Sequence, residues 1–331
     1  MILLVLEELT QVLFLKRSNL IKFILLLSFF SLSFLGIVYS IARESINYEK
    51  ETFIVDQGNS LNSILNKLET KYLRKLALRI YYKLNHQEII IYGEYVMNDI
   101  SYIDFFNDLT SGNVFQRRFV INEGMNIYDL KDTISKLNII NDCVNFSCLQ
   151  NKFDFVEGTL YPDTYFYSVN DFLSTILIFS ESRMDLFLDN IWKNRIEDEN
   201  IKSKKDLLIL ASIIEKESGN EIDKPLISSV FYNRLRNGMR LQADPTIIYG
   251  LLPEFNGDIK KADIYDQTNP YNTYVIDDLP PTPIAIPSKT SLIAASQPSE
   301  TNFLFFVSKG DGSHYFSVTY NEHLSAISEY Q

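Results

Sequence analysis

The first pattern along the chain is an uninterrupted apolar run near the N-terminus. No charged residue lies between Phe23 and Ala42, and about 20 consecutive apolar residues suffice for a helix to cross a bilayer. Basic residues precede the run at Lys16, Arg17 and Lys22. The positive-inside rule predicts a transmembrane helix at residues 23–42, with residues 1–22 in the cytoplasm and the remainder outside. The alternative is a cleaved signal peptide, which the length of the run and the lack of a small-x-small cleavage site disfavour.

Strand–turn–helix patterns follow the apolar run. In residues 53–69, "FIVDQGNSLNSILNKLE", a short strand precedes apolar residues at helical spacing, with Asn59 or Ser60 as the N-cap. Residues 117–138 repeat this order of elements. Two more helices are predicted between these units, at residues 73–84 and 101–112.

We interpret residues 43–149 as one small α+β module with an internal repeat. The strand–turn–helix units resemble a LysM-like module.

From about residue 150 the pattern changes. "FVEGTLYPDTYFY" is rich in aromatic and turn residues, and a long helix is predicted at residues 171–195. A further helix begins at Ser203, where "SKKD" forms a capping box. The next helix begins near Pro225 and stops at Gly238. A hairpin and a terminal helix complete the chain, so residues 150–331 are expected to form a second α+β domain.

Charge and composition exclude several kinds of partner. The 331 residues carry a formal net charge of −11, whereas nucleic-acid binders usually present a basic face. We therefore expect no nucleic-acid partner. Because the chain has only three histidines and two cysteines, no spacing fits a zinc site, and we expect neither a metal nor a cofactor.

The two cysteines are Cys143 and Cys148. They lie outside the membrane on the predicted topology, where disulfides form and persist. A disulfide between them would close a short loop. Two free, buried thiols are the alternative, and the sequence leaves both open.

The helix that begins at Ser203 ends on two carboxylates. "ASIIEKESGNE" places Glu215 and Glu217 just before a Ser-Gly-Asn break. At 100° per residue, Glu217 lies beside the apolar stripe of the helix and Glu215 points away from it. We expect Glu217 to be the desolvated carboxyl and Glu215 to be the more exposed neighbour. The stripe consists of Leu207, Leu210, Ala211 and Ile214.

Burial without a cation favours the neutral form of a carboxyl and raises its pKa. A carboxyl that keeps its proton near neutral pH can serve as the general acid in glycosidic bond cleavage. The structural alternative is that Glu217 only closes the helix end, through an ion pair with Arg234 or Arg240.

The segment "LQADPT" joins that region to another short helix. Asp244 is expected to be its N-cap, with Pro245 at the first helical position. Gln242 would lie on the irregular segment between two helices, where polar side chains can face a cleft.

Several strings in the chain occur together and in a fixed order. They are "EGTLYPDTYFY", "ASIIEKES", "VFYNRLRNGMRLQADPTIIYG" and "YNTYVIDDLPPTPIAIP". Together they resemble the YceG-like family, the endolytic murein transglycosylases of MltG type. The resemblance runs from the membrane helix to the end of the chain and is most specific in the C-terminal half. One departure is Thr282, where relatives usually carry glycine after the paired prolines.

The resemblance implies an enzyme that cuts nascent peptidoglycan strands at the MurNAc–GlcNAc bond and leaves a 1,6-anhydro-MurNAc end. A role in terminating strand elongation follows from this activity. The resemblance further implies a protein of the bacterial inner membrane whose catalytic domain is periplasmic and whose partners are peptidoglycan strands and cell-wall synthases.

The second Glu of the family's "EKE" string is its catalytic residue, which falls on Glu217. In this chemistry one carboxyl suffices. Glu217 protonates the leaving oxygen, the C6 hydroxyl of the sugar closes on C1, and the same carboxylate then removes the hydroxyl proton.

Other polar residues are candidates for lining a glycan groove: Tyr161, Asp163, Gln242, Asp244, Tyr271, Asn272 and His314. Each has a structural alternative. Asp163 and Asp244 border prolines and could simply fix turns. The tyrosines could be core aromatics, and His314 could be a plain strand residue.

Two rival functions remain open at this point. One is a hydrolytic muramidase, whose product would be heavier than an anhydro product by one water. The other is a non-enzymatic scaffold that binds glycan or cell-wall synthases. The scaffold would lose function when the C-terminal domain is truncated but not when Glu217 alone is changed.

Overall fold

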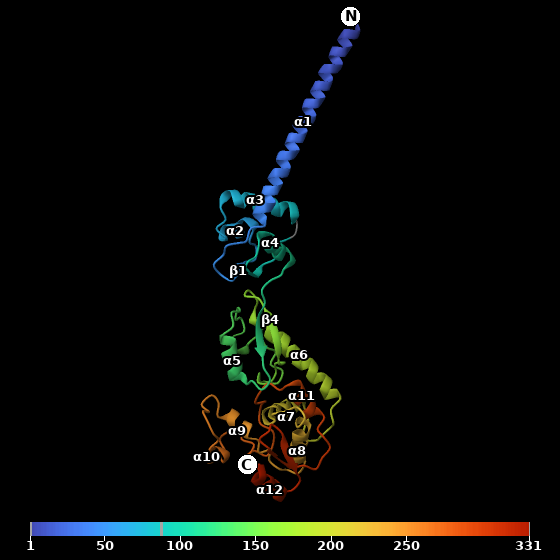
Figure 1. The fold of residues 1–331 in the computed structure, drawn as a ribbon. Helices are drawn as coiled ribbons and strands as arrows, with labels where there is room; N and C mark the ends of the chain where they lie inside the picture. The colour runs from blue at the N-terminus through green and yellow to red at the C-terminus, as the bar shows by residue number, and fades with distance from the viewer. Residues whose placement is uncertain (1, 87–88, 331) are drawn as a thin grey trace. The chain divides into compact units, whose positions relative to one another are not determined.

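The computed structural model describes residues 2–86 and 89–330, with side chains from residue 20 onward. Two compact units make up the chain, one ending at Arg117 and one beginning at Arg118. Helices and strands are mixed in both (Figure 1), as the α+β prediction expected. Every sheet among the described residues is a pair of strands.

The first unit is built on one long helix and a two-stranded sheet. Strands β1 and β2 are antiparallel, with Phe53 opposite Tyr95, and both side chains are at most 2% exposed. Ser60 caps α2 by accepting from the Ser63 amide, as the pattern predicted. The elements of the first unit are α1 (Ile2–Ala42), β1 (Thr52–Val55), α2 (Leu61–Lys67), α3 (Tyr72–Asn85), β2 (Gly93–Val96) and α4 (Tyr102–Ser111).

Within α1, the segment Leu20–Ala42 is long and apolar enough to cross a membrane. It is the only such helix in the part of the chain that the structure describes, and it agrees with the predicted anchor at residues 23–42. Most of its side chains are exposed, but Val38 and Ala42 are buried in the core of the first unit.

The second unit carries the remaining elements. Strand β3 pairs with β4, and β5 pairs antiparallel with β6. The elements are β3 (Arg117–Ile121), α5 (Ile127–Ser135), the 3-10 helix η1 (Val144–Phe146), β4 (Asp163–Tyr167), α6 (Leu173–Lys193), α7 (Lys204–Glu217), α8 (Lys224–Arg236), α9 (Asp244–Gly250), α10 (Lys261–Ile264), α11 (Lys289–Ser296), β5 (Phe305–Ser308), β6 (His314–Ser317) and α12 (Tyr320–Tyr330).

The division between the two units falls between Arg117 and Arg118, whereas the sequence placed the end of the N-terminal module at residue 149. The reason lies in the pairing of β3 with β4. Phe119 and Ile121 of β3 share a core with Leu160 and Tyr165. This core joins the second strand–turn–helix pattern to the C-terminal half of the chain.

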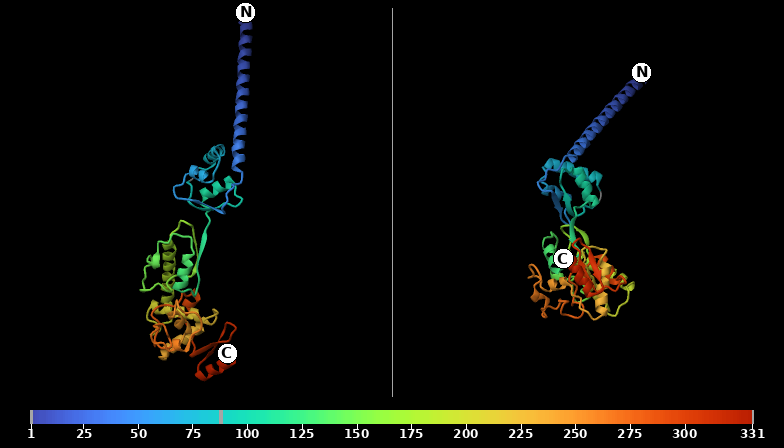
Figure 2. Two further views of the ribbon diagram at one scale, coloured as in Figure 1. Left: turned by 90° about the vertical axis from the view of Figure 1, so that its left-hand side faces the viewer. Right: turned by 60° about the horizontal axis from the view of Figure 1, so that its bottom comes forward.

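Helix α7 is the central helix of the second unit (Figures 1 and 2). Ser203 and Asp206 form the predicted capping box at its start. Every residue from Leu207 to Ile214 is buried, so protein surrounds the helix on all sides rather than on one face. Apolar residues of α8 and α11 belong to the same core, and this packing fixes the position of the last turn of α7.

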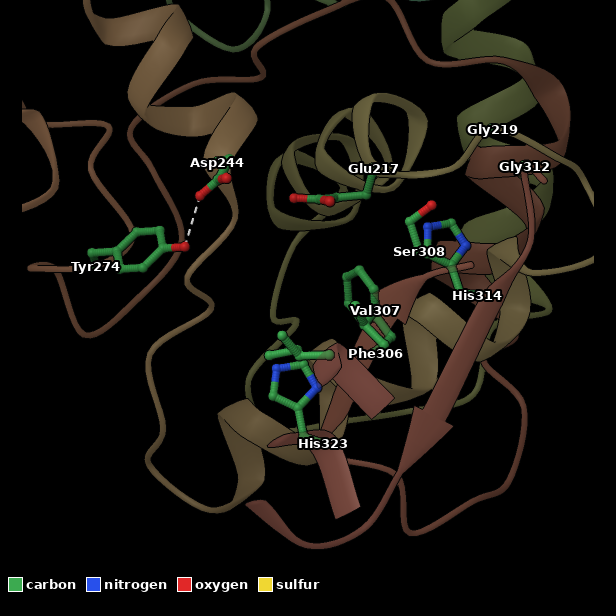
Figure 3. A pocket seen from close by; sticks show the side chains of 11 residues that line it. Glu217, Gly219, Asp244, Tyr274, Phe306, Val307, Ser308, Gly312, His314 and His323 are labelled. Atoms are coloured by element: carbon green, nitrogen blue, oxygen red, sulfur yellow. Dashed lines mark hydrogen bonds between the residues drawn. The ribbon is translucent and has the colours of Figure 1, made fainter. Parts of the chain in front are cut away.

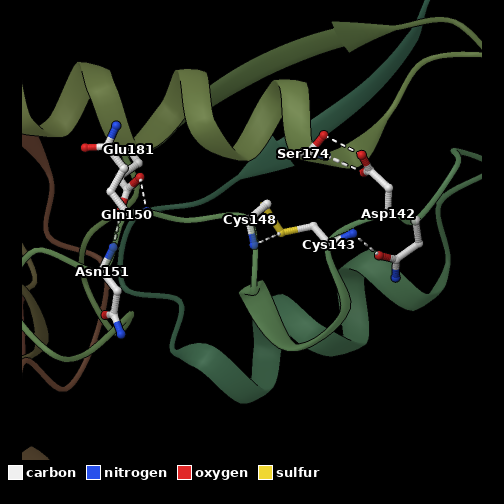
Figure 4. Close-up of a disulfide and its surroundings, with 8 residues drawn as sticks. Asp142, Cys143, Cys148, Gln150, Asn151, Ser174 and Glu181 are labelled. Atoms are coloured by element: carbon white, nitrogen blue, oxygen red, sulfur yellow. Dashed lines mark hydrogen bonds between the residues drawn. A yellow bond between two sulfur atoms is a disulfide. The ribbon is translucent and has the colours of Figure 1, made fainter.

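A disulfide joins Cys143 and Cys148, whose Cα atoms lie 5.2 Å apart (Figure 4). Hydrogen bonds to α6 hold the chain on both sides of this loop. Asp142 accepts from the amide and hydroxyl of Ser174, and Glu181 accepts from the amides of Gln150 and Asn151.

Candidate active site

The carboxyl of Glu217 projects from the last turn of α7 into a cavity of about 570 Å³ (Figure 3). The wall opposite α7 comes from the β5–β6 hairpin and α12. One side comes from the start of α9 and the loop that precedes α11. The lining residues are Glu217, Gly219, Asp244, Tyr274, Phe306, Val307, Ser308, Gly312, His314, His323 and Ile327.

A second cavity of about 240 Å³ adjoins the first. The two share five lining residues: Glu217, Asp244, Tyr274, Phe306 and His323. The second cavity adds Arg234, Gln242, Phe305 and Tyr320 to the wall. Glu217 therefore lies where two connected spaces meet, which suits an extended ligand better than a small one.

Glu217 lies in surroundings that favour the protonated carboxyl. The cavity gives its side chain some exposure, but protein encloses it elsewhere. Burial, reinforced by the charge of Asp244 and partly offset by Arg234, raises its pKa to about 8. This value is suited to a group that must donate a proton near neutral pH.

The cations that could have paired with Glu217 are occupied elsewhere. Arg234 donates to the carbonyl oxygens of Leu304 and Leu241, at 2.7 Å each. Arg240 pairs with Asp277 at 2.8 Å. Among the described residues no cation lies within 4.0 Å of the Glu217 carboxylate. The helix-closing ion pair considered from the sequence is therefore not formed.

Glu215 was expected to be the more exposed of the two glutamates. This expectation is wrong, because its side chain is only 11% exposed. It pairs with the buried Lys224 at 3.2 Å and accepts from Ser288 and Ser291. Burial opposes its ionisation, but the serine hydrogen bonds and Lys224 outweigh burial and hold its pKa below the ordinary value. Glu215 is buried because Lys224, Ser288 and Ser291 from other segments cover it, which a single amphipathic stripe could not indicate.

Asp244 faces the cavity from the first residue of α9, and the N-cap position belongs to Ala243. The expected capping role is therefore wrong. Instead the Asp244 carboxylate accepts from the hydroxyl of Tyr274 at 2.7 Å. Burial and this bond raise the pKa of Tyr274, which therefore remains a hydrogen-bond donor.

His314 is the first residue of β6, and its ring lines the same cavity. Asp223 accepts from the amide of His314 at 2.8 Å, and its Oδ2 lies 2.9 Å from Nδ1 of the ring. Burial disfavours ionisation of Asp223, but hydrogen bonds from His314 and Asn220 hold its pKa below the ordinary value. Asp223 therefore engages Nδ1 of the ring, and no hydrogen bond joins Nε2 to a residue that the structure describes.

Gln242, Asp244 and His314 thus join Glu217 around the connected cavities. Gln242 lies on the predicted irregular segment, in a left-handed conformation with φ of 50°. Its backbone amide donates to the carbonyl of Thr273, which fixes the segment that joins α8 to α9.

The remaining candidates lie outside these cavities. Tyr161 packs under the guanidinium of Arg183, 4.5 Å from the ring centre, and Asp163 pairs with the same arginine at 2.6 Å. The hydroxyl of Tyr271 bonds to Thr282 at 2.9 Å. Asn272 is fully buried and donates to three backbone carbonyls. These contacts engage the ring of Tyr161 and the polar side-chain atoms of Asp163, Tyr271 and Asn272 within the fold.

Sequence reasoning missed several lining residues. Tyr274 was part of a noted string, and its position two residues after Asn272 offered a signal. Phe306 of β5 and His323 of α12 offered no signal in the sequence, because these elements reach the cavity only through the tertiary fold. Arg234 was noted only as a partner for Glu217.

Comparison with known proteins indicates the same family as the sequence strings. Residues 53–329 match the sequence model of the YceG-like family. An endolytic murein transglycosylase of Bacillus subtilis (strain 168) is 34% identical over 183 residues, which cover 53% of this chain and 48% of that protein. An endolytic murein transglycosylase of Streptococcus pneumoniae (strain R6) is 29% identical over 180 residues, covering 53% of this chain and 32% of that protein.

A solved structure is also similar. The yceG-like protein of Listeria monocytogenes superposes with a TM-score of 0.54 at 27% identity, over 83% of this chain and 97% of that one. The matched segment spans less than half the length of the curated relatives. The family match, however, extends over most of this chain. The chain therefore belongs to the YceG-like family.

Proposed function

We propose that the protein is an endolytic lytic transglycosylase that cuts peptidoglycan glycan strands at the MurNAc–GlcNAc bond. The observation that carries the proposal is the carboxyl of Glu217, which lies in a cavity with no ion-pair partner among the described residues and has its pKa raised to about 8. Relatives named endolytic murein transglycosylases support the substrate class. Connected cavities of about 570 and 240 Å³ suit a chain of sugars.

The proposed reaction uses Glu217 twice. The protonated carboxyl gives its proton to the oxygen of the glycosidic bond, and the bond from C1 to that oxygen breaks. The C6 hydroxyl of the same MurNAc then forms a bond to C1, and the Glu217 carboxylate takes the hydroxyl proton. The enzyme returns to its starting state, no water is consumed, and one product carries a 1,6-anhydro end.

Other cavity residues would orient the strand. Nε2 of His314 would bond to a sugar hydroxyl, because Asp223 holds the ring through Nδ1. Asp244 accepts from Tyr274 and keeps acceptor capacity on its other oxygen. The Phe306 side chain offers an apolar surface in the same wall, against which a sugar face can pack.

Hydrolysis, as in a muramidase, is the second candidate reaction, and the position of Asp244 supports it. Inverting glycosidases use a second carboxylate to activate water, and Asp244 lines the same cavity as Glu217. Since Tyr274 already occupies one Asp244 oxygen, we favour the reaction that needs no second base.

Product mass separates the two reactions. Purified glycan strands are digested with the full-length protein, and the new ends are analysed by mass spectrometry. Lytic cleavage predicts anhydro ends that are lighter than reducing ends by one water. Reducing ends alone would overturn the lytic reaction while leaving Glu217 as a candidate general acid.

The location and partners belong to the same proposal. We propose that Leu20–Ala42 anchors the protein in the bacterial inner membrane with the catalytic unit outside, where nascent strands and their synthases are found. Cutting such strands would terminate their elongation. We also propose that the first unit is a LysM-like module, supported by two short helices between the antiparallel strands β1 and β2.

A further inference from the structure

Helix α3 has an apolar face that the first unit does not cover. Ala77, Leu78 and Tyr81 point into the core and are at most 8% exposed. At 100° per residue, Leu73, Leu76 and Leu84 share another side of the helix. Their exposed fractions are 77%, 44% and 62%. Such an uncovered apolar stripe on a helix marks an interaction surface more often than chance exposure.

The charges on α3 are all of one sign. Its sequence, YLRKLALRIYYKLN, contains only basic charged residues. Arg74 pairs with Glu44, and Lys75 donates to Asn66. Arg79 and Lys83 are exposed, lie beside the apolar stripe, and make no ion pair with any residue the structure describes. The combination of an apolar stripe with a basic edge is typical of helices that lie on anionic membrane surfaces.

The position of α3 next to the membrane-crossing helix indicates that its partner is the membrane. It packs against the end of α1, where the ring of Tyr39 lies 6.3 Å from that of Tyr81 and Val38 is 2% exposed. The 23 residues Leu20–Ala42 span roughly 34 Å as a helix, against a hydrocarbon core of about 30 Å. When α1 crosses the bilayer, the turn that contacts α3 lies at the headgroup level.

We propose that α3 is an interfacial helix that docks on the membrane from which α1 emerges. Its leucines insert among the acyl-chain ends, and Arg79 and Lys83 bind anionic phospholipid headgroups. Two exposed tyrosines, Tyr39 and Tyr72, stand where aromatic side chains favour the interface. Figure 1 shows α3 at the end of the first unit from which α1 projects. This contact holds the first unit against the bilayer, and it rests on the proposed membrane anchor but not on the proposed catalysis.

Depth-dependent quenching tests the contact in the full-length protein. Leu73→Cys carries a fluorophore, and the protein is reconstituted in nanodiscs of phosphatidylcholine with phosphatidylglycerol. Ile54→Cys is the control, because Ile54 is a 40% exposed apolar residue on β1. Lipids with a spin label near the headgroup should quench the probe at residue 73 and leave the probe at residue 54 bright.

Charge-removing variants and added salt test whether the partner is an anionic lipid surface. Each basic residue near an anionic surface strengthens binding about fivefold, so Arg79→Gln with Lys83→Gln should sharply reduce quenching at residue 73. Salt of about 1 M should do the same, since it shortens the Debye length to about 3 Å. Equal quenching of the two probes, or no response to charge or salt, would overturn the proposal. Protection of residue 73 only after an added cell-wall protein binds would overturn it in favour of a protein partner.

Discussion

The two glutamates at the end of α7 differ in their partners more than in their exposure. Glu215 is ionised, paired with Lys224 and bonded to two serines. Glu217 lies on a cavity without a cation at ion-pair distance among the described residues, and its pKa is raised to about 8. From the sequence, Glu217 is predicted to be the desolvated carboxyl by its place beside the apolar stripe and the catalytic residue by the family string. It could not show the environment of Glu215, because Ser288 and Ser291 lie more than 70 residues away.

The stability that Glu217 contributes should fall as the pH rises. Its folded-state pKa of about 8 exceeds the ordinary value of 4.5, so the folded protein holds the proton more tightly than the unfolded chain. This contribution is fully present below pH 4.5 and is lost as the pH rises through about 8. Glu217→Gln cannot ionise. Its melting temperature should therefore rise relative to that of the wild type between about pH 5 and about pH 9.

A second buried carboxyl, Glu157, does not affect the difference in melting temperature between Glu217→Gln and the wild type. Burial raises its pKa to about 7, but it is present in both proteins and its effect cancels in the difference. A melting-temperature gap that stays constant with pH would show that Glu217 is not a buried neutral carboxyl.

Glu215→Gln should destabilise the protein while sparing the chemistry. The change leaves Lys224, whose side chain is 6% exposed, without its carboxylate, and breaking a buried pair typically costs about 3–5 kcal/mol. Chemical denaturation should show that loss. The double variant Glu215→Gln with Lys224→Met should recover part of the stability, because no unpaired charge remains. An unchanged free energy of unfolding in the single variant would contradict the assignment of this pair.

At the scale of elements, periodicity and capping residues predicted most of the helices. Ser60 and Ser203 cap α2 and α7 as expected, and Gly112 closes α4 in a left-handed conformation with φ of 74°. These signals are local, so one sequence suffices to find them. The partners of β3 and the walls of the cavity depend on segments distant in sequence, and no local pattern encodes them. This is why the sequence did not indicate the division after Arg117 or the positions of Phe306 and His323 in the cavity wall.

The short loop that Cys143 and Cys148 close around η1 provides the prediction at this scale. With Cys143 and Cys148 bonded, thiol labelling of unfolded, unreduced protein should find no free thiol. Because the closed loop is short, reduction should cost no more than the low end of the usual ~2–4 kcal/mol. The hydrogen bonds that Asp142 accepts from Ser174 and Glu181 accepts from Gln150 should keep the reduced loop folded. Two labelled thiols per chain would contradict the disulfide.

For the whole molecule, the proposed function requires the second unit to lie outside the cytoplasm. Lys16, Arg17 and Lys22 before the apolar run predict that the N-terminus stays inside. A reporter that works only outside the cytoplasm should be active when fused to the C-terminus. Activity of a cytoplasm-only reporter at that position would reverse the topology and remove access to peptidoglycan.

The most direct test of the account is the rate at which Glu217→Gln protein forms anhydro ends on purified glycan strands, expressed per folded molecule. Glutamine keeps the size of the side chain but has no carboxyl proton to give, and general acid–base catalysis typically supplies ~10²–10⁴ in rate. The account predicts a loss of at least about 10²-fold in the Glu217→Gln variant, with the protein still folded, and a far smaller loss per folded molecule in Glu215→Gln. Anhydro ends formed by folded Glu217→Gln protein at nearly the wild-type rate would contradict it.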